Sequence, residues 1–274
     1  MKYDFEIKEI SRYDATEFIQ KLHYSKIMPR LTKHFLGFYM PQRLQLQPLL
    51  VGVLTLGWGT QPKGTINKLF KGLGSEDYYE IGKMCMLEEM PRNSESQMLS
   101  KTIKWLKENY PDKKFLYTWA DGIMGKPGYV YQAANFLYGG FLWTNIYITN
   151  QGEKLHPRST KGLCDENVIF EKERDPTFFD NRKAERIYWL TQDFLDHKKI
   201  SKIHGKQFRY ILPLTKKARK MLKQSSVAWT LNYPKHKDLE WHISTKNGKQ
   251  QLKGLPSIDS NAEEYNSKNI NAHK

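Results

Sequence analysis

Asp121 carries the side chain best placed for chemistry, because it directly follows a stretch of aromatic residues with the pattern of a strand. Residues 115–120, FLYTWA, are expected to form a buried strand, and ligands gather at the carboxyl ends of strands in sheets of this kind. A carboxylate there could orient an amine or accept its proton. Because Asp-Gly is also a common plain turn, Asp121 keeps two interpretations, catalytic and structural.

Further polar groups fall near the ends of two expected helices. His23, Tyr24 and Ser25 follow the first helix and could face the same site as Asp121, although a lone histidine is more often structural than catalytic. Tyr131 and Gln132 fall on the first turns of a later helix. Tyr131 could stack on a base or donate a proton to a leaving group, and Gln132 could hold an adenine edge. Core packing explains the tyrosines equally well.

Residues 91–96, PRNSES, open an amphipathic helix without any large apolar side chain. Ser94 and Gln97 have the spacing of a capping box, which satisfies amides of the first turn. Capping leaves Arg92 unexplained, because a cation is unfavourable at the positive end of a helix dipole. A bound anionic or polar donor would remove that conflict. The candidate donor-binding residues are Arg92, Asn93, Ser94, Glu95 and Ser96, and the Ser96 hydroxyl is also a catalytic candidate.

Positive charge is concentrated in the C-terminal half of the chain. Of the net charge of +15, residues 151–274 contribute +10, from 25 Lys plus Arg against 15 Asp plus Glu. Residues 198–223 hold ten basic residues and no acidic one, a composition that favours a polyanion. We expect DNA contact, with RNA, an acidic protein or solubility alone as alternatives. The expected phosphate contacts are Lys206, Arg209, Lys216, Lys217, Arg219 and Lys220.

Several protein classes are not indicated. The first ten residues are charged throughout and no apolar run of about 18 residues occurs, so neither export nor a membrane span is predicted, and we expect a cytoplasmic protein. Cys85 and Cys164 lie far apart, without the spacing of a disulfide scaffold or a zinc site. The HExxH motif is absent and the eight histidines are scattered, so no metal site is predicted and iron is left open.

Strands and helices alternate along the part of the chain that must position these side chains. Periodicity predicts the order β-α-β-β-β-α-β-α-β for residues 1–150, with a helix at residues 128–138 closed by Gly139 and Gly140. The fold class is therefore α+β, with a mixed central sheet flanked by helices. We expect residues 1–150 to form the catalytic domain, residues 151–256 a basic and mostly helical extension that includes a helix at residues 182–197, and residues 257–274 a flexible tail.

The predicted order resembles the GNAT acetyltransferase superfamily, in which helix amides at this junction hold the pyrophosphate of coenzyme A. PRNSES replaces the usual Gln/Arg-x-x-Gly-x-Gly/Ala loop there. More specifically, three blocks resemble the Mom family of phage DNA-modification proteins: HYSKIMP at residues 23–29, LEEMPRNSES at residues 87–96, and TWADGIMGKPGYVYQAANFLYGGF at residues 118–141. The resemblance spans residues 12–150, favours the catalytic interpretation of Asp121, and implies transfer of a carbamoylmethyl group to adenine in DNA.

Three functions are therefore weighed. The first is a transferase that modifies the exocyclic amine of adenine, which requires a flipped or unpaired base. The second is an acyl-coenzyme A-dependent N-acetyltransferase acting on a protein or small amine, against which the missing glycine loop speaks. The third is a non-catalytic nucleic-acid-binding protein. The sequence does not identify the small-molecule donor, for which acetyl-coenzyme A or a related acyl donor is considered, nor the oligomeric state.

Overall fold

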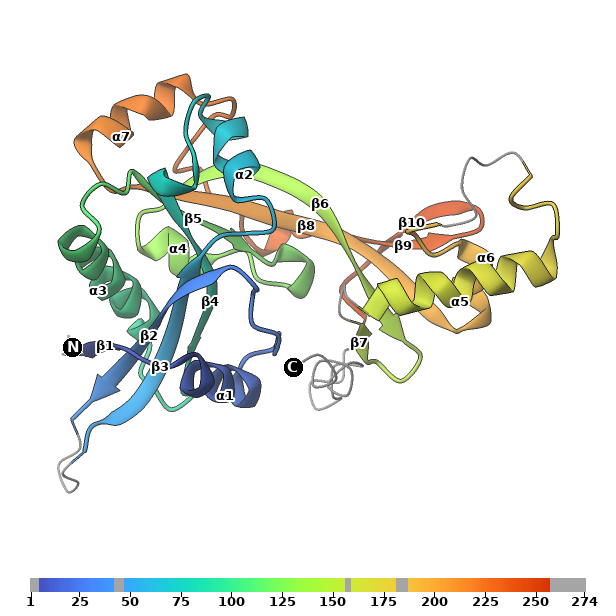
Figure 1. Ribbon diagram of the computed structural model, residues 1–274, viewed down its shortest axis with the longest axis horizontal. Helices are drawn as coiled ribbons and strands as arrows, with labels where there is room; N and C mark the ends of the chain where they lie inside the picture. Colours follow the sequence, from blue (N-terminus) through green and yellow to red (C-terminus); the bar gives the residue numbers. More distant parts are fainter. Residues whose placement is uncertain (1–4, 42–46, 156–158, 181–186, 257–274) are drawn as a thin grey trace. The chain divides into compact units, whose positions relative to one another are not determined.

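The computed structural model describes residues 5–41, 47–155, 159–180 and 187–256 of the chain (Figure 1). The chain divides into two compact units. Unit 1 comprises residues 1–121, 126–142 and 208–235, and unit 2 comprises residues 122–125, 143–207 and 236–274. The second half of the basic segment, from residue 208, therefore belongs to unit 1 together with the strand that precedes Asp121.

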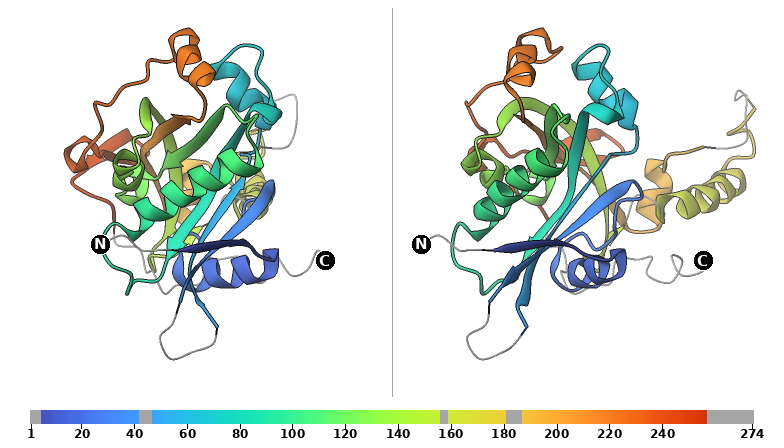
Figure 2. Two further views of the ribbon diagram at one scale, coloured as in Figure 1. Left: turned by 90° about the vertical axis from the view of Figure 1, so that its left-hand side faces the viewer. Right: turned by 60° about the vertical axis from the view of Figure 1, so that its left-hand side comes forward.

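Unit 1 is built on a mixed sheet, which two further views show in Figure 2. In order across the sheet its strands are β1 (Glu6–Glu9), β2 (Thr32–Met40), β3 (Leu49–Gly57), β4 (Tyr78–Met86), β5 (Phe115–Ala120) and the second half of β8 (Ile200–Pro213). All neighbours pair antiparallel except β4 and β5, which run parallel. Antiparallel neighbours can be joined by short turns, whereas the parallel pair needs a crossover, and a helix supplies it between β4 and β5.

Helices cover both faces of this sheet. They are α1 (Arg12–Leu22), α2 (Pro62–Leu69), α3 (Ser94–Asn109), α4 (Tyr129–Ala133) and α7 (Lys216–Met221), with 3-10 turns at η1 (Ser75–Asp77) and η3 (Leu222–Gln224). Val53 of β3 packs in a cluster with Ala15 and Ile19 of α1, whereas a Cβ on the adjacent Gly52 would meet Met98 of α3. Adjacent strand residues point to opposite faces, so α1 and α3 lie on opposite sides of the sheet. The expected mixed sheet with flanking helices is confirmed.

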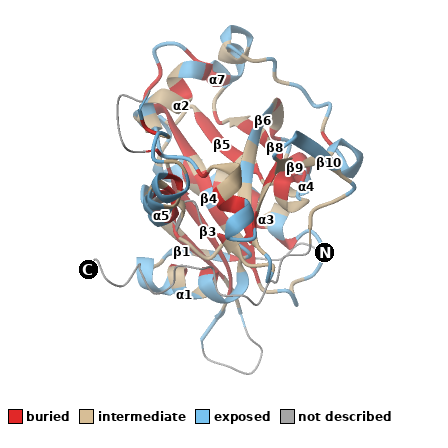
Figure 3. Ribbon diagram, turned by 90° about the vertical axis from the view of Figure 1, so that its right-hand side faces the viewer, coloured by how far each residue is buried: buried red, intermediate tan, exposed pale blue. Residues whose placement is uncertain are grey.

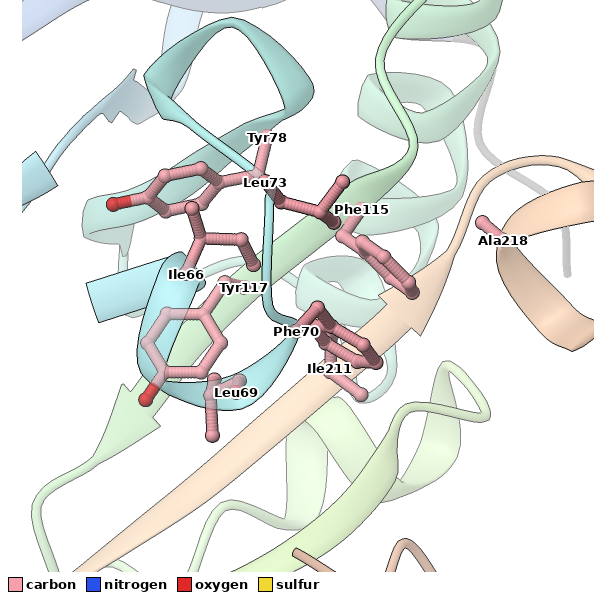
Figure 4. Packing of buried hydrophobic residues seen from close by; sticks show 9 residues of the cluster. All are labelled: Ile66, Leu69, Phe70, Leu73, Tyr78, Phe115, Tyr117, Ile211 and Ala218. Atoms are coloured by element: carbon pink, nitrogen blue, oxygen red, sulfur yellow. The ribbon is translucent and has the colours of Figure 1, made fainter. Parts of the chain in front are cut away.

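An aromatic and aliphatic cluster joins β4, β5 and β8 to α2 and α7 (Figure 4). Phe115 of β5 stacks on Phe70 with ring centroids 4.5 Å apart, and both rings are at most 2% exposed. The residues drawn in Figure 4 are Ile66, Leu69, Phe70, Leu73, Tyr78, Phe115, Tyr117, Ile211 and Ala218. Because Ala218 of α7 is among them, part of the basic segment is anchored in the core of unit 1.

Unit 2 contains a second sheet region and two further helices. Its elements are the second half of β6 (Leu137–Thr149), β7 (Lys154–Leu155), α5 (Ser159–Arg174), α6 (Gln192–His197), the first half of β8, β9 (Trp241–Thr245), β10 (Gly248–Leu252), η2 (Gly122–Met124) and η4 (His236–Asp238). Leu163, Phe194 and Ile200 are buried in its core. Figure 3 shows buried residues concentrated in the strands and exposed residues on the outer helix surfaces.

The helix expected at residues 128–138 is much shorter in the structure. The helix α4 ends at Ala133, because Asn135 takes a left-handed conformation with φ of 59° and the Phe136 amide returns to the Tyr131 carbonyl at 3.0 Å. The residues Gly139 and Gly140 lie in β6 rather than at a helix cap, and a Cβ on Gly139 would lie 2.2 Å from the Trp229 ring. That close approach, and not a cap, explains the first glycine.

The extension is less helical than expected. Residues 200–213 form β8, in which Phe208 and Tyr210 are buried and alternate with Arg209, a strand pattern that the density of cations conceals. Of the helix expected at residues 182–197, only α6 is seen; residues 181–186 and the tail at residues 257–274 lie outside the described residues. The basic segment is therefore mostly a strand of the sheet followed by one short helix.

Candidate active site

The parallel pairing of β4 and β5 ends early and leaves polar side chains between the strand ends. The register runs from Tyr78 opposite Phe115 to Glu80 opposite Tyr117, although β4 continues to Met86 and β5 to Ala120. At the next position the Thr118 hydroxyl reaches the Ile81 carbonyl at 3.4 Å. Beyond this point the two strands no longer form a ladder, so groups from neighbouring loops can approach both strand ends.

Tyr24 and Asp121 meet at the end of β5. The Tyr24 hydroxyl donates a hydrogen bond to Oδ2 of Asp121. The Tyr24 ring stacks on His23, with centroids 4.3 Å apart, and Lys126 Nζ lies 4.2 Å from the ring centre. Burial, the negative charge of Asp121 and the hydrogen bond to it together raise the pKa of Tyr24 far above its usual range, although the residue is 36% exposed. The pair is therefore a neutral phenol bound to a carboxylate.

A buried lysine holds the loop that carries Tyr24. Lys83, on β4 and 9% exposed, donates from Nζ to the Ser25 carbonyl at 2.8 Å and to Ser25 Oγ at 2.7 Å. The register of β3 with β4 shifts at Gly82, and this bulge turns Lys83 toward the loop. The Ser25 amide in turn donates to Nδ1 of His23 at 2.9 Å. The structure thus uses His23 and Ser25 to fix the loop beside Tyr24.

Tyr131 lies close to the same carboxylate. It is 9% exposed, and burial together with the charges of Asp121, Glu95 and Glu80 raises its pKa to about 12, although the hydrogen bond with Thr118 acts in the opposite direction. Tyr131 and Tyr24 also interact electrostatically, so ionisation of Tyr131 would further disfavour ionisation of Tyr24. Tyr24, Asp121, Lys126 and Tyr131, which we term the polar cluster, therefore include two protonated phenols, one carboxylate and one cation.

The start of α3 differs from the expected capping box. The helix begins at Ser94, so that Asn93 is the residue before it, with φ of 72° and no side-chain cap. The hydroxyl of Ser94 is buried and donates to the Pro91 carbonyl at 2.6 Å, and that of Ser96 donates to the Asn93 carbonyl at 2.9 Å. The prediction that the Ser94 side chain caps this helix is therefore wrong. The left-handed Asn93 and the turn back to Pro91 set the helix start instead.

Glu95, in the first turn of α3, lies close enough to act on two groups of the site. Its charge raises the pKa of Tyr131, and with burial it raises the pKa of Cys85 to about 11. Cys85 is consequently a protonated thiol at neutral pH and not an activated nucleophile. The exposed Arg92 lies just before this turn. Of residues 91–96, Glu95 thus acts electrostatically on Tyr131, and donor binding by this segment stays a prediction.

Gln132 is used inside the protein. It is 9% exposed, and its amide nitrogen donates to the Tyr210 hydroxyl at 3.0 Å and to the Pro234 carbonyl at 3.0 Å. Its oxygen accepts from Lys235 Nζ at 3.0 Å. These contacts fix the segment at residues 234–235 on α4. They leave the hypothesis that Gln132 reads an adenine edge without structural support.

The predicted phosphate contacts are spread over both units. Arg209 of β8 lies opposite Trp119 of β5, with its guanidinium 5.2 Å from the ring centre and its buried Nε without a hydrogen-bond partner. Lys206, in unit 2, pairs with Glu240 at 2.7 Å. The remaining four cations, Lys216, Lys217, Arg219 and Lys220, are exposed on α7. Pro213, the last residue of β8 before α7, pairs with Phe115, the first residue of β5. The helix α7 therefore begins near the start of β5, whereas Asp121 lies after its end.

Three residues of the site were missed by the sequence analysis: Lys83, Lys126 and Glu80. Burial raises the pKa of Glu80 to about 7, against the opposing effect of a hydrogen bond from the Gly59 amide. Lys83 and Glu80 interrupt an otherwise apolar strand, EIGKMCM, and that interruption was the available signal. Lys126 had no comparable signal because it lies in a loop. Among the described residues, no group of three or more His, Cys, Asp or Glu side chains is placed to hold a metal ion.

Comparisons with known proteins agree with the predicted family. A sequence profile of the Mom protein family matches residues 4–235. The chain is 28% identical over 220 residues to the methylcarbamoylase Mom of Escherichia phage Mu, an alignment that covers 80% of this chain and 79% of that protein. A tandem GNAT protein from the clavulanic acid biosynthesis pathway, solved without AcCoA, aligns over 96% of this chain and 82% of its own, with 8% identity and a TM-score of 0.34. No helix among the described residues is long and apolar enough to cross a membrane. Because the profile covers most of the 274 residues and includes Tyr24, Asp121 and Tyr131, this chain belongs to the Mom protein family.

Proposed function

We propose that this chain is a DNA-modifying transferase that adds a small group to the exocyclic amine of adenine. The observation that carries the proposal is the hydrogen-bonded Tyr24–Asp121 pair at the strand ends of a Mom-family chain. The named relative is a methylcarbamoylase of a phage, which supports a carbamoylmethyl group as the one transferred. The partners are then DNA and a small-molecule donor, and the location is the cytoplasm of a phage-infected host.

The reaction requires a base, because the exocyclic amine of adenine is a weak nucleophile until it loses a proton. In the proposed step the amine nitrogen attacks the electrophilic carbon of the donor, a nitrogen–carbon bond forms, and the bond from that carbon to the leaving group breaks. Asp121 accepts the amine proton. Tyr24 holds the carboxylate in position through its hydrogen bond. Tyr131, a protonated phenol at neutral pH, donates its proton to the leaving group.

The adenine must leave the base stack before Asp121 can reach its amine. Lys126, whose ammonium lies over the Tyr24 ring, is the cation of the polar cluster and could contact a nearby phosphate of the DNA backbone. Arg209 on β8, whose guanidinium lies 5.2 Å from the centre of the Trp119 ring, provides a second cation. These two residues of unit 1 support backbone contact close to the reacting base.

The start of α3 does not fit the pyrophosphate of coenzyme A. The Ser94 hydroxyl is occupied by the Pro91 carbonyl, and Glu95 places a carboxylate in the first turn, where it would repel an anion. Arg92 and residues 91–96 are therefore proposed to bind a small donor that is not a coenzyme A thioester. This argument ranks the acyl-coenzyme A acetyltransferase hypothesis below the DNA-modifying one.

Nucleoside mass spectrometry of DNA from cells that express the protein tests the proposal. We expect a modified adenosine with the wild type, none with Asp121→Asn, and the wild-type amount with the control Asp112→Asn, which changes an exposed carboxylate in a turn. Unmodified adenine with the wild type would overturn the proposal. Turnover of acetyl-coenzyme A with a polyamine would favour the acetyltransferase instead. If replacing Asp121 and replacing Ser94 both leave the phenotype of the cells unchanged, a non-catalytic binding protein would be favoured.

A further inference from the structure

One face of the sheet in unit 2 gathers cationic and imidazole side chains from three strands. His204 of β8 lies opposite His242 of β9, and Ser244 of β9 lies opposite Lys249 of β10. Directly opposed residues share a face, and residues two apart along a strand return to it. We term Lys202, Lys206, His242 and Lys249 the cationic face. His204 lies among them but is neutral at neutral pH, because burial and the neighbouring lysines lower its pKa to about 4. The cationic face extends over β8, β9 and β10.

The other face of these strands is packed within unit 2. A Cβ added to Gly205 would lie 2.6 Å from Ile123, and Trp241 donates from its indole nitrogen to the Ile123 carbonyl at 2.8 Å. Gly205 and Trp241 are paired across β8 and β9 and point away from the cationic face. The 3-10 turn η2 therefore covers the opposite side, and a ligand of these strands would have to approach the cationic side.

The positive charges on this face are incompletely balanced. Glu240 pairs with Lys206 at 2.7 Å and with His242 at 3.4 Å. Among the described residues, Lys202 and Lys249 form no ion pair. Burial, and after it the positive charge of Lys249, lowers the pKa of Lys202. Of the three lysines in residues 241–254, Lys246 is balanced by Asp193 at 2.7 Å, which leaves Lys249 on this face without an acidic partner among the described residues. Crowded like charges of this kind are relieved when an anion binds between them.

An exposed aromatic ring adjoins these cations. Trp143 of β6 is 47% exposed, lies 5.7 Å from Lys206 Nζ, and meets His242 edge to face with ring centroids 5.4 Å apart. An exposed indole among lysines is the arrangement that single-stranded nucleic acids use, because an unpaired base stacks on the ring while cations contact the backbone. A paired duplex offers no base face for such stacking.

We propose that the cationic face binds an opened DNA strand, with Lys202 and Lys249 on the phosphate backbone and Trp143 stacked on an unpaired base. The proposal rests on the proposed function, in which adenine must be unpaired. It adds a binding surface that includes β9 and β10, which lie beyond residues 4–235 matched by the family profile. The occupant is a polyanion with accessible bases, which matches both the charge and the aromatic ring.

Fluorescence anisotropy with a short labelled single-stranded DNA, and with the duplex of the same sequence, tests this binding surface. Replacing Trp143 with Leu should weaken single-strand binding by about tenfold, as expected for one lost base stack, and leave duplex binding within about twofold. The double variant Lys202→Gln with Lys249→Gln should reduce the slope of log K against log salt by about 1.4, because each lost phosphate contact on a single strand removes about 0.7. The control, Lys104→Gln with Lys107→Gln, removes two exposed lysines of α3 and should change neither value.

Unchanged single-strand binding in both the Trp143 and the lysine variants would overturn the inference. If the double variant does not fold, Lys249→Gln alone, at an exposed position, must still lower the slope by about 0.7. Tighter binding of the RNA strand of the same sequence would assign the face to RNA and overturn the DNA assignment. Nucleoside mass spectrometry on the same variants separates the two proposals. Modified adenine together with unchanged single-strand binding in the variants contradicts only this inference. A wild type that binds the single strand but modifies nothing, with weaker binding in the variants, contradicts only the proposed function.

Discussion

The Tyr24 hydroxyl donates a hydrogen bond to Oδ2 of Asp121 from a position 97 residues away in the chain. The contact joins the loop after α1 to the end of β5, and the carboxylate raises the pKa of the phenol together with burial. Tyr24 therefore stays protonated through the physiological range and can orient Asp121 without competing for its role as a base.

Replacing Tyr24 with Phe should lower the rate of adenine modification by about 100-fold, within the range that one positioned acid–base group contributes. The ring, its stacking on His23 and its contact with Lys126 are retained, so the melting temperature should stay near the wild-type value. Single-turnover modification of an oligonucleotide measures the rate. Tyr13→Phe, at an exposed residue of α1, is the control, and an equal rate for both variants would remove the hydroxyl from the mechanism.

Replacing Lys83 with Met should destabilise the protein by about 1–3 kcal/mol, because the part-buried Ser25 carbonyl and hydroxyl lose their donor. Ser25→Ala removes only the hydroxyl contact and should cost less. Urea unfolding followed by circular dichroism gives both free energies. Since Lys83 acts through the loop that carries Tyr24, the modification rate should fall in the same order. A Lys83 variant that is stable and fully active would contradict this positioning role.

At the start of α3, substitutions of Asn93 should change stability, whereas substitution of Arg92 should change activity. Asn93→Ala should cost about 1 kcal/mol because alanine is disfavoured in the left-handed region, whereas Asn93→Gly should be neutral or slightly stabilising. Arg92→Ala should leave the unfolding free energy within about 0.5 kcal/mol and abolish modification, if residues 91–96 bind the donor. An active Arg92 variant would reduce this stretch to a structural helix start.

Sequence patterns predicted the strand before Asp121, the loop that carries Tyr24, and the helix that residues 91–96 open, because each has a local signal. They did not predict the hydrogen bonds of Gln132 to Tyr210 and Pro234, which join segments about 80 and 100 residues apart. Only tertiary packing decides whether such an amide faces a ligand or the protein. The strand β8 was missed for a related reason: its alternation of Phe208, Arg209 and Tyr210 is visible, but ten cations in 26 residues suggested a solvent-facing segment.

The raised pKa of Glu80 predicts a pH-dependent stability. Burial raises its pKa from an ordinary value of 4.5 to about 7, so the folded chain holds this proton more tightly than the unfolded chain does. Its contribution to stability is then fully present below pH about 4.5, decreases as the pH rises, and is lost above pH about 7. Melting temperatures of Glu80→Gln should lack this decrease, relative to the exposed control Glu89→Gln. Parallel pH profiles of the two variants would contradict the assignment.

The four cations of α7 should contribute to the binding of long duplex DNA and not to the modification step. Asp121 lies after the end of β5, and α7 begins beside its start. The strand β5 has six residues at about 3.3 Å each, so about 20 Å separates the two along the strand direction. That span corresponds to about six base pairs of duplex. Changing Lys216, Lys217, Arg219 and Lys220 to Glu should weaken binding to a long duplex and reduce its salt slope by up to about 3.6, at about 0.9 for each lost phosphate contact.

Modification of a short single-stranded substrate should be unaffected, because its phosphates do not reach α7. The two substrates are compared under identical salt. Equal losses on both would place α7 at the reaction itself, and no loss on either would assign its charges to solubility alone.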